Sequence, residues 1–146
     1  MSAGCIFCKI VRGEAPAYRV YEDADTLVFM DIFPVTDGHT LVVTKAHWAD
    51  VFDTSEDGLA AVARTAHRVA QAIRTTLNPD GLMVFQLNGA AAGQTVFHYH
   101  MHLMPRAHGE PLQLHTRVAG DPARLQALAS RLAAALTANP EPASAP

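Results

Sequence analysis

The sequence is poor in features that several protein classes require. Its net charge is −3 and its pI is near 6.2, so it offers no broad basic surface. Tight binding to nucleic-acid polymers depends on many lysine and arginine contacts to phosphates, and this composition therefore disfavours it. Any phosphate site must be local.

The sequence also lacks segments that direct a chain to a membrane. No apolar run approaches the roughly 18 residues of a membrane span, and residues 1–8 contain neither a basic region nor a long apolar stretch. We therefore expect a cytoplasmic protein without membrane contact. A chain of 146 residues suits one domain, which we place at residues 1–139, followed by a disordered proline- and alanine-rich tail at 140–146.

Two cysteines, Cys5 and Cys8, form a single Cys-x-x-Cys motif. Such a pair can be half of a zinc site, a redox pair or, rarely, a strained disulfide. A redox pair would follow a strand and open a helix in a βαβ unit, whereas no strand precedes this motif. A structural zinc site needs four ligands, so histidines would have to supply the other two.

Three histidines, His98, His100 and His102, alternate with apolar residues between positions 93 and 104. This period of two predicts a strand with the three histidines on one face. The opposite face would carry Phe97, Tyr99, Met101 and Leu103. Pro105 lacks an N–H group, so we expect the strand to stop there. A single histidine on an apolar strand is usually structural, but three on one face indicate metal ligands, a nucleophile or acid–base groups.

The other segments predict short strands and two helices. The expected strands are 18–22, 26–31, 39–44 and 82–87, and the expected helices run from a cap at 54–55 to about residue 77 and from residues 121–122 onward. Apolar spacing predicts the buried face of the first helix at Leu59, Val62, Ala63, Ala66, Val69, Ala70, Ile73 and Leu77, and that of the second at Leu125, Leu128, Leu132 and Leu136. Residues 9–16 read as a polar connector and 106–120 as a loop. This order predicts an antiparallel α+β sheet.

The loop from Asn88 to Thr95 suits an anion. Its small residues let backbone N–H groups approach a ligand closely, and Asn88, Gln94 and Thr95 offer neutral donors. It is not a P-loop, because no Gly-Lys-Ser/Thr follows. Three further histidines, His67, His108 and His115, we interpret as surface or solvated loop residues.

The segment 93–104 resembles the signature of the histidine triad (HIT) family, in which three histidines alternate with apolar residues. Residues 93–96 and the upstream Asn88 are similar to the phosphate loop of that family, and the similarity extends back to Cys5. The fold that this resemblance implies is a five-stranded antiparallel sheet with one long helix and a C-terminal helix. In that family two copies form a homodimer with a ten-stranded sheet.

The resemblance implies a hydrolase or transferase that cleaves at the α-phosphate of purine nucleotide derivatives, either nucleoside phosphoramidates or dinucleoside polyphosphates. His100 matches the nucleophile that forms a nucleotidyl-histidine, His102 the histidine that binds phosphate and stabilises the transition state, and His39 a supporting histidine. A neutral imidazole can act as this nucleophile at pH 7 when its other nitrogen is held by an acceptor. Further nucleotide contacts would come from Asp31 on the ribose, Ile32 on the base, and Asn88, Gly93, Gln94 and Thr95 on phosphate.

The resemblance also extends to a zinc-binding branch of that superfamily, whose ligands match Cys5, Cys8, His47 and His98. His98 would then leave catalysis and join the N-terminal motif to the active-site strand. In the alternative, His98 is a catalytic acid or base and no metal is bound. Two other functions stay open: a nucleotide-binding regulatory or scaffold protein with incidental hydrolysis, and a catalytic zinc hydrolase. Four protein ligands argue against the last, because they leave no position for water.

Overall fold

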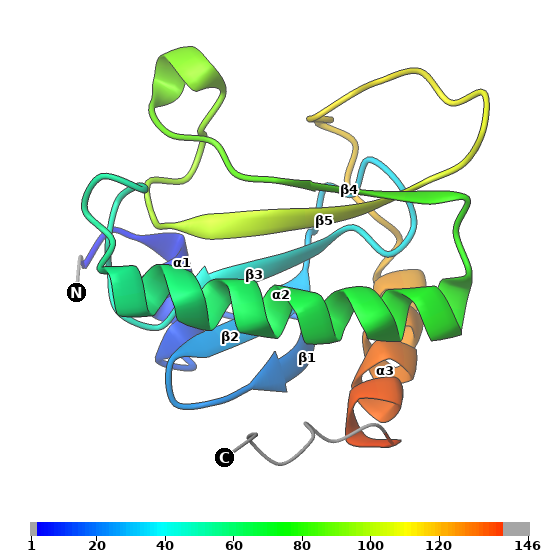
Figure 1. The fold of residues 1–146 in the computed structure, drawn as a ribbon, viewed down its shortest axis with the longest axis horizontal. Helices are drawn as coiled ribbons and strands as arrows, with labels where there is room; N and C mark the ends of the chain where they lie inside the picture. Colours follow the sequence, from blue (N-terminus) through cyan, green and yellow to red (C-terminus); the bar gives the residue numbers. More distant parts are fainter. Residues whose placement is uncertain (1–2, 139–146) are drawn as a thin grey trace.

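A computed structural model describes residues 3–138, and the predicted tail at 140–146 lies outside them. The strands form one five-stranded sheet, and Figure 1 shows a long helix across one face of it. In chain order the elements are α1 (Ile6–Val11), β1 (Arg19–Glu22), β2 (Thr26–Met30), β3 (Thr40–Thr44), α2 (Glu56–Leu77), β4 (Gly81–Phe85), the 3-10 helix η1 (Ala90–Ala92), β5 (His100–Arg106) and α3 (Pro122–Ala138).

The strands lie in the order β1-β2-β3-β5-β4, and every neighbouring pair is antiparallel. The predicted fold class is therefore confirmed, and β5 lies inside the sheet between β3 and β4. None of the helices between residues 3 and 138 combines the length and apolar character that a membrane crossing needs.

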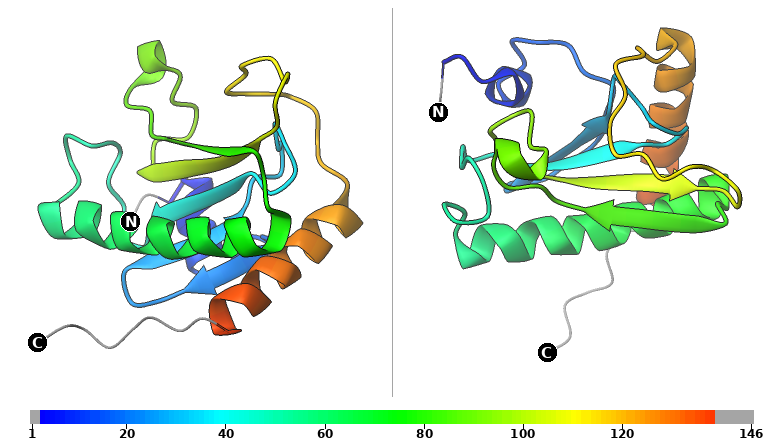
Figure 2. Two further views of the ribbon diagram at one scale, coloured as in Figure 1. Left: turned by 45° about the vertical axis from the view of Figure 1, so that its right-hand side comes forward. Right: turned by 90° about the horizontal axis from the view of Figure 1, so that it is seen from above.

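The sheet is covered on both faces. Helices α2 and α3 pack on one face, and α1 lies on the other (Figure 2). Alternate side chains of β2 pack on opposite faces of the sheet. Val28 and Met30 belong to the core below α2 and α3, while Leu27 and Phe29 belong to the cluster below α1. In β5, His100 pairs with Val43 and His102 pairs with Leu41, whose side chains belong to the α1 cluster. The two histidines therefore point to the face that carries α1.

Capping residues lie at both ends of α2 and at the start of α3. The Ser55 hydroxyl accepts a hydrogen bond from the Gly58 N–H at the start of α2, and Asn78 ends that helix in the left-handed region. The Asp121 carboxylate caps α3 by accepting from the Arg124 N–H. The expected stripe of α3 is buried at all four leucines. On α2 the expectation is wrong for Ala63, which is exposed.

The expected polar connector at residues 9–16 is wrong in its first part, because α1 continues to Val11 and buries Ile10. Cys5 caps this helix, since its Sγ accepts a hydrogen bond from the Cys8 N–H at 3.4 Å. The spacing of Ile6, Phe7 and Ile10 is that of one helical face and could have predicted the helix.

Strand β5 differs from its prediction at both ends. It begins at His100, so His98 precedes the strand in a bend, and Phe97 is 50% exposed rather than packed in the core. At the other end it continues through Pro105, whose carbonyl oxygen accepts from the Thr36 hydroxyl at 2.6 Å. The N–H and C=O of a strand residue point to the same side. The missing N–H of Pro105 thus faces the loop before β3, beyond the last β3–β5 pair, and no ladder bond is lost.

Candidate functional site

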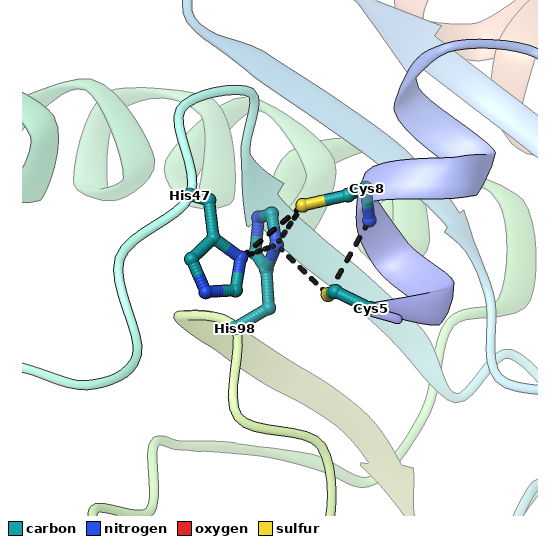
Figure 3. A group of neighbouring side chains, drawn as sticks. All are labelled: Cys5, Cys8, His47 and His98. Atoms are coloured by element: carbon teal, nitrogen blue, oxygen red, sulfur yellow. Dashed lines mark hydrogen bonds between the residues drawn. The ribbon is translucent and has the colours of Figure 1, made fainter. Parts of the chain in front are cut away.

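The four predicted metal ligands lie close together beside the start of β5. Cys5 and Cys8 come from α1, His47 follows β3, and His98 precedes β5 (Figure 3). One ligand atom from each residue lies within 4.8 Å of the others. The tertiary fold therefore brings together residues that are separated by up to 93 positions in the sequence.

The distances between these atoms fit the edges of a tetrahedron around zinc. With usual Zn–S and Zn–N bond lengths, a tetrahedral site has S···N edges of about 3.6 Å and N···N edges of about 3.3 Å. Here Cys5 Sγ and Cys8 Sγ each lie 3.5 Å from His98 Nδ1, Cys8 Sγ lies 3.2 Å from His47 Nδ1, and the two Nδ1 atoms are 3.3 Å apart. The group can therefore hold a metal ion with two thiolate and two imidazole ligands.

The tautomer of His98 suits this arrangement. Its Nε2 lies 2.6 Å from the carbonyl oxygen of Thr44. A carbonyl oxygen only accepts, so Nε2 must carry the hydrogen and Nδ1 presents its lone pair to the two cysteines. Burial lowers the pKa of His98 to about 4, which favours the neutral ring.

His100 is held in the opposite tautomer. Its Nδ1 lies 2.6 Å from the backbone carbonyl oxygen of His98, so Nδ1 carries the hydrogen and Nε2 has the free lone pair. The ring is buried, with the Phe7 ring edge-on at 5.0 Å between centroids. Burial lowers the pKa of His100, which keeps Nε2 unprotonated at neutral pH.

A chain of hydrogen bonds fixes the tautomers of His39 and His102. The Val35 N–H donates to His39 Nδ1 at 3.2 Å, so His39 carries its hydrogen on Nε2. That Nε2 lies 2.9 Å from His102 Nδ1 and donates to it, which leaves His102 with an N–H group at Nε2. Burial lowers the pKa of His39 to about 4 and that of His102 to about 2, so both rings are neutral.

The rings of His100 and His102 are neighbours, with centroids 4.9 Å apart. His102 also stacks on Phe85 of β4, at 4.4 Å and an interplanar angle of 5°. The site thus places an unprotonated ring nitrogen beside a ring N–H donor. This pair can attack an electrophilic centre and donate a hydrogen bond to an oxygen on that centre.

The family model of the HIT domain matches residues 12–109. The chain belongs to the HIT domain family. Protein hit from Bacillus subtilis is 46% identical over 102 residues, which cover 70% of this chain and 70% of that protein. Adenylylsulfatase HINT3 from Arabidopsis thaliana is 38% identical over 102 residues, which cover 70% of this chain and 52% of that protein.

Solved structures share the whole fold of this HIT domain. A Hit-like protein from Bartonella henselae has a TM-score of 0.86 at 37% identity, covering 93% of this chain and 98% of that one. A Zn-bound histidine triad family protein from Mycobacterium smegmatis has a TM-score of 0.82 at 43% identity, covering 92% and 94%. A hypothetical histidine triad nucleotide-binding protein from Sulfolobus tokodaii has a TM-score of 0.84 at 30% identity, covering 92% and 93%.

The loop at residues 88–95 of the HIT domain uses its predicted phosphate donors internally. The Asn88 amide bonds to Gln86, and its oxygen also accepts from the Val51 N–H at 2.7 Å. The Gln94 amide donates to the Ala49 carbonyl oxygen, and its oxygen accepts from the Gly89 N–H. Asn88 and Gln94 therefore brace the loop in this state. Thr95 is exposed beside them.

The two residues predicted for the nucleoside lie at the end of β2. Asp31 is half-buried; one of its carboxylate oxygens accepts from the Phe33 N–H at 2.8 Å, and the other lies 3.5 Å from His39 Nε2. Burial raises the pKa of Asp31. Ile32 is 51% exposed and Phe33 43% exposed, so an apolar surface lies next to the carboxylate.

Sequence reasoning missed two contacts of His102. Phe85 stacks on His102 because the two residues are paired in the β4–β5 register, and the local sequence does not reveal this register. His115 is exposed, as expected, but its ring centroid lies 6.3 Å from that of His102, edge-on. His67 and His108 are exposed and have no such contact among the described residues.

Proposed function

We propose that this HIT domain hydrolyses purine nucleotide derivatives at the α-phosphorus through a nucleotidyl intermediate on Nε2 of His100. The substrates are nucleoside phosphoramidates or dinucleoside polyphosphates. The observation that carries the proposal is the 2.6 Å hydrogen bond from His100 Nδ1 to the His98 carbonyl oxygen. It leaves Nε2 unprotonated and fixed, as a nucleophile at neutral pH requires.

The reaction has two steps. First, His100 Nε2 attacks phosphorus and forms a P–N bond, while the bond to the leaving group breaks and the leaving group keeps its electron pair. An amine leaving group takes a proton from solvent as its bond to phosphorus breaks, so that it departs as the neutral amine. Second, water attacks the same phosphorus and releases one proton to solvent, while the P–N bond breaks and its electron pair returns to Nε2. The nucleoside monophosphate leaves, and the two steps together consume one water molecule.

The neighbouring residues bind and orient the nucleotide. His102 donates its Nε2 hydrogen to a phosphate oxygen on which charge develops, and His39 holds that donor in place. Asp31 accepts from the ribose hydroxyls, and Ile32 packs against the base. Thr95 contacts phosphate directly, whereas Gly93, Asn88 and Gln94 do so only by exchanging their present partners for phosphate oxygens.

We also propose that Cys5, Cys8, His47 and His98 hold zinc. The tetrahedral distances and the His98 tautomer support this, as does a Zn-bound relative in the family. Zinc bound there acts as a structural crosslink between α1 and the residues before β5. All four donors come from the protein, so the reaction runs on His100 and not on a metal-bound water.

Two relatives support the nucleotide assignment by their names, one an adenylylsulfatase and one a nucleotide-binding protein. The test is to quench the wild type during turnover of an adenosine phosphoramidate and of a diadenosine polyphosphate. Intact and peptide mass spectra should show one adenylyl group on His100. Tight AMP binding with negligible turnover of both substrates would instead favour the regulatory or scaffold function.

A further inference from the structure

His115 is an exposed histidine that the fold places against the buried histidines. Its segment, between β5 and α3, passes over the sheet face opposite α2 (Figure 2). The ring lies edge-on to His102, and its Nε2 lies 3.4 Å from the position that a Cβ atom on Gly93 would occupy. The imidazole of His115 therefore lies next to Gly93 at the mouth of the site.

The site has few other donors for a second anionic group. The Gly93 and Gln94 N–H groups donate to the Ala90 and Gly89 carbonyl oxygens, and the Gln94 amide donates to Ala49. His102 offers one N–H, which the α-phosphate would take. Apart from the exposed Thr95, a group beyond the α-phosphate therefore needs a donor from outside the loop, and His115 lies at its edge.

The electrostatics of the site agree with this position. Burial is the largest cause of each pKa shift at the site, and the electrostatic effect of His115 is a smaller cause that lowers the pKa of His39, His100, His102 and Asp31. The field of His115 thus reaches each of these groups, which surround the place where we put the nucleotide.

We propose that His115 binds the leaving group and makes the enzyme prefer leaving groups that carry negative charge, such as a phosphate chain. This inference rests on the proposed hydrolysis at the α-phosphorus. In such a displacement the leaving group lies opposite the attacking nitrogen. Since His100 is buried, the leaving group points away from it towards solvent, where His115 lies. An imidazole N–H donates to phosphate oxygens and gains little from a neutral amine.

The test compares a diadenosine polyphosphate with an adenosine phosphoramidate in wild type, His115→Ala and His115→Arg. His108→Ala is the matched control, because His108 is an exposed histidine on the same segment. A hydrogen bond to a charged group changes a rate constant by about tenfold or more. We expect His115→Ala to slow formation of the intermediate from the polyphosphate by at least that factor and from the phosphoramidate by less than about threefold.

Hydrolysis of the intermediate should be unchanged in His115→Ala, because the leaving group has departed by then. His115→Arg supplies an N–H donor of its own and should restore the preference for the polyphosphate. An equal loss for both substrates, or no loss for either, would overturn the assignment of His115.

An equilibrium measurement keeps this test separate from the proposed reaction. In a His100→Ala background, which removes the nucleophile, calorimetry compares the affinities for AMP and ADP. His115→Ala should lower the affinity for ADP by about tenfold and leave that for AMP unchanged. A wild type without turnover would refute the reaction while this comparison still decides the contact, and equal effects on AMP and ADP would refute the contact alone.

Discussion

His100 donates its Nδ1 hydrogen to the backbone carbonyl oxygen of His98, with 2.6 Å between the two atoms. The side chain of His98 belongs to the cluster of candidate zinc ligands, and its main chain sets the tautomer of the candidate nucleophile. The two sites are therefore coupled through two residues of backbone. Loss of a ligand from the cluster should therefore lower the reaction rate by shifting the position of His100.

Replacing His100 by alanine should lower turnover by a factor on the order of 10⁴ or more, because the nucleophile is lost. Nucleotide affinity should change little, and bound zinc should stay, since His100 ligates no metal in our assignment. Single-turnover rates, calorimetry and elemental analysis measure the three quantities. His67→Ala, an exposed histidine on α2, is the control and should behave as wild type. A rate like that of wild type in His100→Ala would refute the covalent mechanism.

Cys5→Ser and His98→Ala should share one defect, the loss of zinc. Free zinc at about a thousand times its Kd stabilises a folded protein by about 4 kcal/mol. For a domain of this size that corresponds to a fall in Tm of roughly 10 to 15 °C. Elemental analysis and thermal unfolding measure the two effects. If the wild type is zinc-free and fully stable, and Cys5→Ser is silent, His98 is an acid or base instead.

The same two variants should differ in rate. His98→Ala frees the backbone that orients His100, two residues along the chain, so activity should fall strongly. Cys5→Ser removes a ligand at the start of α1 and leaves the His98 side chain in place, so it should lower the rate less. The comparison of kcat at saturating substrate, below both melting temperatures, checks this order.

The sequence predicts most of the fold because its signals are local. Ser55 and Asn78 set the ends of α2 by bonds within one turn, and the leucines of α3 share one stripe. Two errors come from tertiary effects. Helix α1 is only six residues long and is fixed by Cys5 and by packing of Ile10 on the sheet. Pro105 can continue β5 because β3 does not extend beside it, so no β3 residue needs a hydrogen bond from its missing N–H.

The site is predictable in its residues but not in its chemistry. The motif places His98, His100 and His102 next to one another, yet each has a different partner. His98 donates to Thr44, His100 donates to His98, and His102 accepts from His39. These tautomers depend on carbonyl and ring atoms brought close by tertiary structure, so no spacing in the sequence could reveal them.

We expect a homodimer in which β4 pairs with β4 of a second copy. β4 is an edge strand of the sheet, and Val84 on it is 49% exposed. Unpaired backbone groups on such an edge are a template for pairing across a two-fold axis. Val84→Asp should weaken the dimer at least about tenfold, since it would bring two like charges together. Ala127→Asp places the same charge on the exposed side of α3 and should leave the dimer intact. Sedimentation at micromolar concentration decides, and a monomeric, fully active wild type would refute the expectation.

Stability should fall as the pH falls from 6.5 towards 4. Burial lowers the pKa of His39 to about 4 and that of His102 to about 2, from 6.5. In this range the unfolded chain therefore binds protons on both rings and the folded chain does not, so acid favours unfolding. Each ring approaches a slope of about 1.4 kcal/mol per pH unit well below pH 6.5, which amounts to about 3 kcal/mol for the two together between pH 6.5 and 5.

Urea unfolding of His102→Gln isolates this effect. The variant should show a shallower dependence of the free energy of unfolding on pH, by about 1.4 kcal/mol per pH unit, because one titrating ring is gone. Asp31, whose pKa burial raises, acts in the opposite direction, and the zinc ligands also titrate, but both contributions are common to the two proteins and cancel in the difference. His67→Gln removes an exposed ring and should leave the slope unchanged. Parallel curves for wild type and His102→Gln would mean that His102 has the same pKa in the folded and the unfolded chain, which would refute the lowered pKa assigned to the buried ring.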